Sequence, residues 1–167
     1  MEPDTPATFE ATFRPDIRVC FNWNRFRSEQ WPIEAVRVSD REVLGECVLP
    51  WYLGRTGQEV AFDQPGAVPI RLAQIPEVVA SLAKRQTGIE EYTTKFRAER
   101  QVEFSVPTYN LGNRRHLALD GNHRLSALIL ASVSFAVTFW CVGGPLDARC
   151  LPDLIHWHGE QDAEPHS

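Results

Sequence analysis

The stretch Leu119-Asp120-Gly121-Asn122-His123-Arg124 decides the fold predicted for this chain, because it joins a short strand to an apolar helix through one sharp turn. A glycine lets the backbone turn tightly and approach a ligand closely. The helix that follows begins with unpaired N–H groups and the positive end of its dipole. A strand, a tight turn and a helix N-terminus are together typical of an anion-binding site.

The side chains of this stretch fit the same interpretation. His123 and Arg124 lie in the first helical turn, where the dipole disfavours cations and a bound anion would offset that cost. Arg124 can donate two parallel hydrogen bonds to a phosphate, and Asp120 could take a proton from a hydroxyl or help to hold a divalent metal. The structural alternative is that Asp120 or Asn122 caps the helix while the two cations pair with surface carboxylates.

The segments on either side predict regular elements. Residues 102–106 and 115–119 flank an Asn- and Gly-rich turn at 110–113, which indicates a β-hairpin. Apolar residues after Arg124 keep helical spacing to about residue 131. The apolar run 135–142 is rich in β-branched and aromatic residues, which favours a strand buried on both faces.

Two helices are expected before the hairpin. An apolar face with i, i+3, i+4 spacing predicts a helix over about 75–86, with Pro76 in its first turn and Gly88 suited to its end. Residues 90–100 could form a second helix that pairs Tyr92 with Phe96.

The first third of the chain is less regular. The polar residues 1–16 contain three prolines and predict a flexible arm. Segments 18–23, 35–38 and 42–49 have the composition of strands, with a turn or bulge at the glycine of the third. The glycine-rich stretch 54–66 predicts a loop of the kind that borders ligand sites.

Length and charge indicate one folded unit with unevenly placed charge. The chain has 167 residues and a formal net charge of −5. Residues 147–167 hold one arginine and five carboxylates, so they contribute −4 and leave −1 for the rest. We therefore expect a flexible arm over 1–16, a single α+β domain over 17–146 with a compact mixed β-sheet and a few helices, and an acidic tail over 147–167.

Composition also bears on compartment and partners. No run of about 18 apolar residues and no signal peptide is found, which predicts a cytoplasmic protein without a membrane partner. The four cysteines, Cys20, Cys47, Cys141 and Cys150, fit no C-x-x-C pattern and are expected to be reduced. The chain has no surplus of basic residues, which argues against an extended nucleic-acid-binding surface. Among its seventeen basic residues, only Lys84 and Lys95 are lysines.

Residues 102–142 resemble the core of the ParB/sulfiredoxin superfamily, in which a strand ends in a turn of the form [D/G]-G-x-[H/R]-R and an apolar helix and a buried strand follow. The chain supplies these parts in order as Val102–Tyr109, Asn110–Asn113, His116–Leu119, Asp120-Gly121-Asn122-His123-Arg124, Leu125-Ser126-Ala127 and Ser134–Val142. The helix expected near 75–86 matches one that precedes the hairpin in such proteins. The resemblance does not extend N-terminal to residue 67.

The resemblance implies that this turn and helix start bind nucleotide phosphates. Sulfiredoxins bind ATP there, the chromosome-partition proteins bind CTP, and free-serine kinases, which carry a similar D-G-H-H-R motif, bind adenine nucleotide. Gly121, Asn122, His123 and Arg124 thus become candidate nucleotide contacts. Asp120 and His123 are the candidate catalytic residues, with Asp120 at the position of the kinase-type carboxylate.

Departures from the superfamily pattern exclude two of its activities. Sulfiredoxins place their reactive cysteine where this chain has Asn122, so sulfinic-acid reduction is not expected. The partition proteins show G-E-R-R at 121–124 and continue into a helix-turn-helix domain, whereas 25 residues follow Val142 here. DNA is therefore not an expected partner.

We accordingly predict an enzyme that uses ATP or ADP, or CTP as a variant, with Mg²⁺ to phosphorylate a hydroxyl of a small-molecule substrate. One alternative is a nucleotide-binding or sensing module without catalysis. A different small-molecule enzyme on the same fold is another, and a nuclease is disfavoured because the charge balance is acidic.

A few further residues have two possible roles. The aromatic side chains Phe21, Trp23, Phe26, Trp31, Trp51 and Tyr52 could stack on a ligand, although core packing is the more frequent use. Glu34 and Glu46 are candidate partner bases for Asp120. His156 and His158 have a usable metal-ligand spacing, but two ligands do not make a site, so no metal ligand is predicted.

Overall fold

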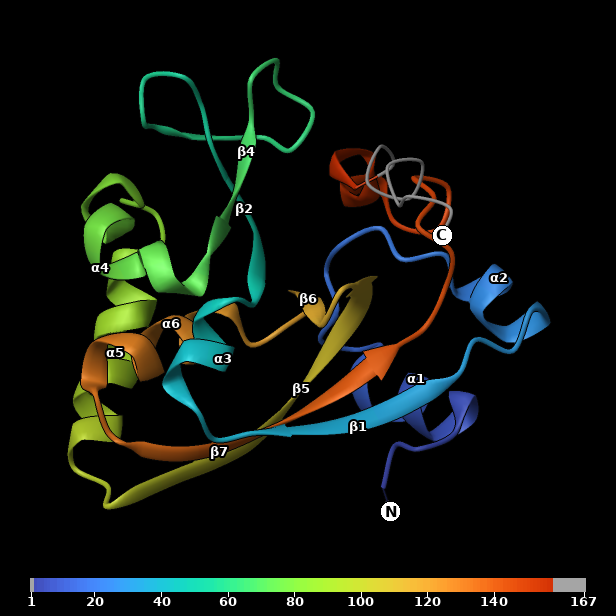
Figure 1. The fold of residues 1–167 in the computed structure, drawn as a ribbon, viewed down its shortest axis with the longest axis horizontal. Helices are drawn as coiled ribbons and strands as arrows, with labels where there is room; N and C mark the ends of the chain where they lie inside the picture. The colour runs from blue at the N-terminus through green and yellow to red at the C-terminus, as the bar shows by residue number, and fades with distance from the viewer. Residues whose placement is uncertain (1, 158–167) are drawn as a thin grey trace.

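The protein folds as a seven-stranded mixed β-sheet with helices at both ends of its long strands (Figure 1), in a computed structural model that describes residues 2–157. The strands are β1 (Ile33–Val38), β2 (Val48–Leu53), β3 (Glu59–Val60), β4 (Val68–Arg71), β5 (Gln101–Gly112), β6 (Arg115–Ala118) and β7 (Ser134–Val142). The helices are α1 (Pro6–Phe13), α2 (Trp23–Ser28), α3 (Arg41–Gly45), α4 (Ile75–Val78), α5 (Gln86–Arg97) and α6 (Asn122–Ala131), with 3₁₀ segments η1 (Leu72–Gln74), η2 (Val79–Ser81) and η3 (Pro152–His156). The predicted α+β class is confirmed.

The sheet has the strand order β1-β7-β5-β6-β2-β3, and β4 pairs with β2. β7 lies between β1, which is antiparallel to it, and β5, which is parallel to it from Gln101↔Ser134 to Tyr109↔Val142. Seven of the nine residues of β7 are buried. The predicted strand with two covered faces is confirmed. Among residues 2–157, no helix is long and apolar enough to cross a membrane.

The predicted hairpin is formed by β5 and β6, which pair in antiparallel fashion. Its turn places Gly112, Asn113 and Arg114 at positive φ. The side chain of Asn110 accepts a hydrogen bond of 2.8 Å from the N–H of Gly112 and so closes the turn. Glycine and asparagine tolerate the left-handed backbone that such a turn requires, which is why the sequence signal was informative.

Two apolar clusters hold the fold together. The first joins α3–α6 to one end of the sheet, and the second joins α1, α2 and residues 146–157 to the other end. Figure 1 shows the two sets of helices at opposite ends of β1, β5 and β7.

The helix predicted over 75–86 is broken into short pieces. α4 ends at Val78, η2 covers the next three residues, and Leu82 has a non-helical backbone with φ −103° and ψ 55°. The amide of Gln86 donates hydrogen bonds of 3.1 Å to the carbonyl oxygens of Val79 and Ala80, so it satisfies the carbonyls that the break leaves free. The second predicted helix, over 90–100, is present as α5, which begins four residues earlier, at Gln86, and ends at Arg97.

Two predicted strands are in part helical. The segment 18–23 forms no strand, because Asn22 caps α2 through a 3.0 Å hydrogen bond from the N–H of Arg25. Within 42–49, Asp40 accepts hydrogen bonds from the first N–H groups of α3, and only the last two residues belong to β2. Side-chain caps override strand composition here because they satisfy backbone donors locally. The strand predicted over 35–38 is present as β1.

The ends of the chain differ from the predicted arm and tail. Residues 6–13 form α1, whose Phe9 is fully buried and lies 5.6 Å from the ring of Phe26. At the other end, Leu154 and Trp157 are buried in the same cluster. Both segments are therefore part of the domain, because their aromatic and aliphatic side chains complete the second apolar cluster. The rest of the predicted tail, 158–167, lies outside the described residues.

Truncation of Phe9 tests whether α1 belongs to the cooperative fold. We expect Phe9→Ala to lower the free energy of unfolding by about 3 to 5 kcal/mol, the usual cost of removing a fully buried phenylalanine ring. Urea denaturation followed by tryptophan fluorescence measures this change. The exposed Thr12→Ala in the same helix is the control and should stay within about 0.5 kcal/mol of the wild type. Equal losses for the two variants would contradict the packing of α1.

Candidate functional site

A pocket of about 530 Å³ opens at the start of α6. All five residues of the sequence motif, Asp120 to Arg124, lie in its wall. The remaining wall comes from elements that are distant in sequence, including Asp16 and Arg18 after α1, Trp51 of β2 and Arg85 before α5. The structure thus places all five motif residues in one pocket wall and adds others.

The turn into α6 depends on Gly121. This residue has φ +78°, and a Cβ at its position would lie 2.5 Å from Cγ1 of Val106. A side chain is therefore excluded both by conformation and by contact with β5. The N–H of Leu119 donates to the oxygen of Pro107 at 2.9 Å on one side of the turn, and the N–H of Leu125 donates to the oxygen of Gly121 at 2.9 Å on the other.

The N-terminus of α6 has no side-chain cap among the described residues. Gly121 occupies the N-cap position, so the alternative in which Asp120 or Asn122 caps this helix is wrong. Side chains cap the starts of α1, α2 and α3, whereas α4 and α5, like α6, begin without a side-chain cap among the described residues. The first N–H groups of α6 consequently remain free to bind an anion in the pocket.

Asn122 adds an unsatisfied polar atom to this wall. Its Oδ1 is buried and has no hydrogen-bond partner among residues 2–157. A buried acceptor without a donor costs about 1 to 3 kcal/mol. The backbone of Asn122 is held in place by the hydroxyl of Ser126, which donates to its carbonyl oxygen at 2.7 Å. A ligand that brings a donor or a cation to Oδ1 would recover this cost.

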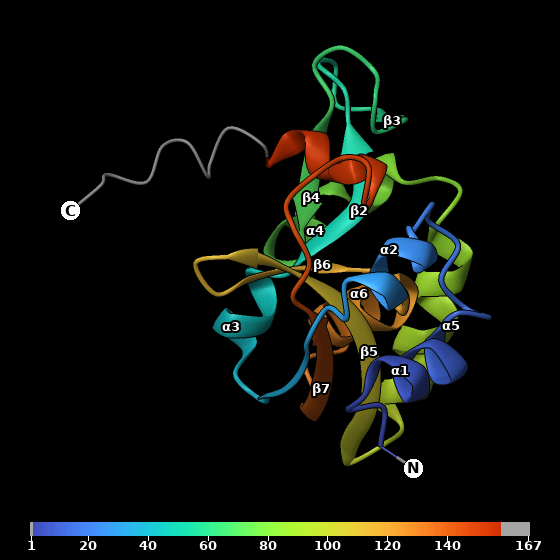
Figure 2. The ribbon, with the colours of Figure 1, turned by 90° about the vertical axis from the view of Figure 1, so that its right-hand side faces the viewer.

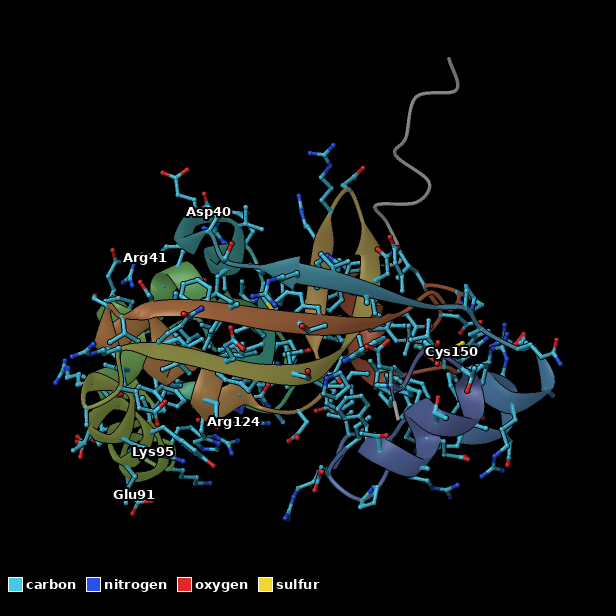
Figure 3. The ribbon with its side chains drawn as sticks, turned by 90° about the horizontal axis from the view of Figure 1, so that it is seen from below. Asp40, Arg41, Glu91, Lys95, Arg124 and Cys150 are labelled. Atoms are coloured by element: carbon cyan, nitrogen blue, oxygen red, sulfur yellow. The ribbon has the colours of Figure 1, made fainter. Side chains whose placement is uncertain are left out.

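Arg124 is positioned by weak contacts that leave its donors available. Its Nη2 lies 3.8 Å from Oδ2 of Asp120, and its Cζ lies 4.9 Å from the centre of the Phe104 ring. Side chains of Asp120 and Arg124 are each about one-third exposed. Figure 3 shows Arg124 on the same side of the long strands as Lys95 and opposite Arg41. A phosphate could therefore compete with Asp120 for the guanidinium.

His123 is held neutral by its surroundings. Its ring packs edge-on against Trp51 at 5.1 Å, and a Cβ on Gly88 of α5 would lie 2.8 Å from its Cδ2. Burial lowers the pKa of His123, the nearby Arg85 lowers this pKa further, and Asp120 opposes both effects. The imidazole is therefore uncharged near neutral pH, and it can donate or accept a hydrogen bond but adds no fixed positive charge.

Arg85 and Arg18 are site residues that sequence reasoning did not find. The Cζ atom of Arg85 lies 5.0 Å from the centre of the Trp51 ring. Arg85 also pairs with Glu59 at 3.2 Å. Arg18 reaches the pocket from the segment that follows α1. No local pattern marks either arginine, because their places depend on how distant segments pack.

The two candidate partner bases lie elsewhere. Glu34 is on β1, where its charge acts on His116 and Cys141, and it does not line the pocket. Glu46 pairs with Arg71 at 3.5 Å on the surface. The second carboxylate that does line the pocket is Asp16.

Other sequence predictions have mixed outcomes. Core packing of the aromatic group is confirmed: Trp23 is partly buried against the second cluster, and the buried members are Phe21, Phe26, Trp31, Trp51 and Tyr52. All four cysteines are unpaired, as expected. His156 contacts the oxygen of Phe62 at 2.8 Å, His158 lies outside the described residues, and no group of three or more metal-ligating side chains occurs within residues 2–157.

No family model, curated protein or solved structure matches this chain. The resemblance drawn from the sequence therefore stays a prediction.

Alanine substitutions at two glycines separate conformational strain from steric contact. Gly112 and Gly121 have φ of +81° and +78°, but only Gly121 has a neighbour where a Cβ would lie. We expect Gly112→Ala to cost about 1 to 2 kcal/mol for its left-handed backbone. Gly121→Ala should cost about 1 to 3 kcal/mol more, because Val106 must move. Thermal and urea unfolding measure both values, and equal losses would contradict the contact with Val106.

The imidazole of His123 is expected to titrate below its ordinary pKa of about 6.5. Because Arg85 lowers this pKa and Asp120 raises it, Arg85→Gln should move the pKa up and Asp120→Asn should move it down. The folded pKa lies below the unfolded one, so His123 contributes stability above pH 6.5 that is lost as the pH falls through the folded pKa. Two-dimensional NMR of the ring protons measures these shifts, and a pKa at or above 6.5 would contradict the burial of this ring.

Proposed function

We propose that this protein binds a nucleoside phosphate with its phosphate groups at the N-terminus of α6 and transfers a phosphate to the hydroxyl of a small molecule. The observation that carries the proposal is the uncapped start of α6, which opens into a 530 Å³ pocket lined by Arg124. The resemblance of the Asp120–Arg124 motif to nucleotide-binding turns supports the choice of ligand.

The charges of the pocket suit an anion. Its wall contains Arg18, Arg85 and Arg124 against the carboxylates of Asp16 and Asp120, so the formal charge is +1 with His123 neutral. The free N–H groups of the first turn add the positive end of the helix dipole. Donors that are fixed before the ligand arrives need little reorganisation, which is how enzymes stabilise charge that develops on a phosphoryl group.

The oxygen donors present also suit a magnesium ion that arrives with the nucleotide. Asp120, Asp16 and Asn122 line the same pocket, and Oδ1 of Asn122 is buried without a hydrogen-bond partner among residues 2–157. Mg²⁺ in nucleotide sites usually takes only one or two protein carboxylates, together with phosphates and water. Asp16 and Asn122 would hold such an ion, which would offset negative charge on the phosphates and leave Asp120 to act on the acceptor.

Asp120 is the residue placed to activate the acceptor. In the proposed step its carboxylate takes the proton of the substrate hydroxyl as the new O–P bond forms. The bond between the transferred phosphorus and the bridging oxygen breaks, and the nucleotide leaves with one phosphate fewer. Phosphate binding to Arg124 would draw this guanidinium away from its 3.8 Å contact with Asp120 and free the carboxylate.

Two variants separate binding from transfer. With ATP and Mg²⁺ we expect a raised melting temperature for the wild type, and phosphorus NMR should show transfer to a hydroxyl acceptor. Asp120→Asn should keep the thermal shift but lower the transfer rate by about 10²- to 10⁴-fold, because the general base is lost. Arg124→Gln should weaken nucleotide binding by about tenfold or more, since a charge-assisted hydrogen bond contributes about 1.5 to 3 kcal/mol.

The control for these variants is Arg100→Gln, because this exposed arginine lies between α5 and β5 and does not line the pocket at the start of α6. It should behave as the wild type. The same screen with ADP, CTP and GTP identifies the nucleotide. Stabilisation without transfer to any acceptor would contradict the transferase and favour a sensing module, and no stabilisation by any nucleotide would contradict both.

A further inference from the structure

A second pocket of about 480 Å³ adjoins the first. The two share Arg18, Val19, Pro50, Trp51 and Arg85, so one groove runs from the start of α6 past β2 to η3. Figure 2 shows η3, in red, beside β2 and β4. A ligand in the second pocket would therefore be a neighbour of a nucleotide in the first.

Two of the three cations that line the second pocket have no carboxylate partner among residues 2–157. The side chains of Lys84 and Arg18 line it and have no hydrogen-bond or ion-pair partner within the described part of the chain. The third cation, Arg85, is already paired with Glu59 at 3.2 Å. Two cations are thus left to face the groove.

The other acidic group of this pocket is also occupied. Asp153 is 6% exposed, and its Oδ2 accepts a 2.5 Å hydrogen bond from the hydroxyl of Tyr52. Burial raises the pKa of Asp153, while this hydrogen bond opposes the rise. The pair joins β2 to η3, and the 2.8 Å contact of His156 with the oxygen of Phe62 joins η3 to the loop after β3. These contacts fix the side of the second pocket that β2, η3 and the loop after β3 form. The side chains of Lys84 and Arg18 are therefore available to bind a ligand.

We propose that the acceptor of the phosphate carries an anionic group of its own, which Lys84 and Arg18 bind in the second pocket while its hydroxyl reaches Asp120. This inference rests on the proposed function. The substrate class is a small anionic alcohol, with either a carboxylate or a phosphate as the anion. The pocket volume of about 480 Å³ is large enough for a small alcohol that carries one such anion. Lysine and arginine both bind these two anions through charge-assisted hydrogen bonds.

The lysine content of the chain offers a direct test of binding. Lys84 and Lys95 are its only lysines, and Lys95 is exposed on α5 outside both pockets. Reductive ¹³C-methylation keeps the charge and labels these two side chains and the N-terminal amine, with Lys84→Arg and Lys95→Arg assigning the signals. Titration with ribose 5-phosphate and with D-glycerate tests the two anions, and ribose and glycerol are the neutral counterparts.

We expect one or both anionic alcohols to shift the Lys84 signal with saturation, while Lys95 stays unchanged and the neutral alcohols have no effect. A larger response to ribose 5-phosphate than to D-glycerate would assign the anion as a phosphate, and the reverse would assign a carboxylate. No shift of Lys84 with either anion, or equal shifts of both lysines, would overturn the inference.

Transfer kinetics in the full chain supply the second arm. Lys84→Gln should raise KM for the anionic acceptor about tenfold and leave kcat and the nucleotide Kd unchanged, and Lys95→Gln should change none of them. Saturable binding at Lys84 without any transfer would overturn the proposed function and keep the second pocket. Transfer to neutral alcohols as fast as to anionic ones would overturn the inference and keep the transferase.

Discussion

The close approach of β5 to the turn before α6 is the constraint on which the site depends. Val106 lies where a side chain at residue 121 would have to be, so only glycine fits, and its φ of +78° sets the direction in which α6 leaves the sheet. Because this glycine has no side chain to cap the helix, the first N–H groups stay free. One packing contact in the core thus fixes the geometry of the turn and leaves the start of α6 without a side-chain cap.

The charged side chains around this turn differ in whether another side chain holds them. Neutral His123 packs on Trp51, whose ring also contacts Arg85, so three side chains from different elements support one another. Arg85 is further held by Glu59 and Arg124 by Asp120. Arg18 and Lys84 have no ion-pair partner among residues 2–157 and face the part of the groove that lies beside β2 and η3. Cations that are ion-paired in the free protein are less available, because a ligand must first displace their partners.

Local sequence patterns predicted the elements that are specified by residues close together in the chain. The hairpin, α6 and β7 follow from turn residues, helical spacing and an apolar run, each of which depends on neighbours in sequence. Prediction was poorer where a single side chain decides between two states. The caps at Asn22 and Asp40 turned strand-like composition into helix, and Phe9 drew a proline-rich segment into the core as α1.

The sequence by itself determined the turn and the helix start at residues 119–124, because a glycine after a short strand and the helical spacing of the apolar residues that follow specify both locally. Only the tertiary structure decided which distant residues complete the pocket. Pairing of β2 with β6 at Val48↔Leu117 places Trp51 beside the turn, and the segment after α1 delivers Arg18. The tertiary structure also places Glu34 and Glu46 outside the pocket. Contacts between residues far apart in the chain follow from strand order and core packing, for which local spacing carries no signal.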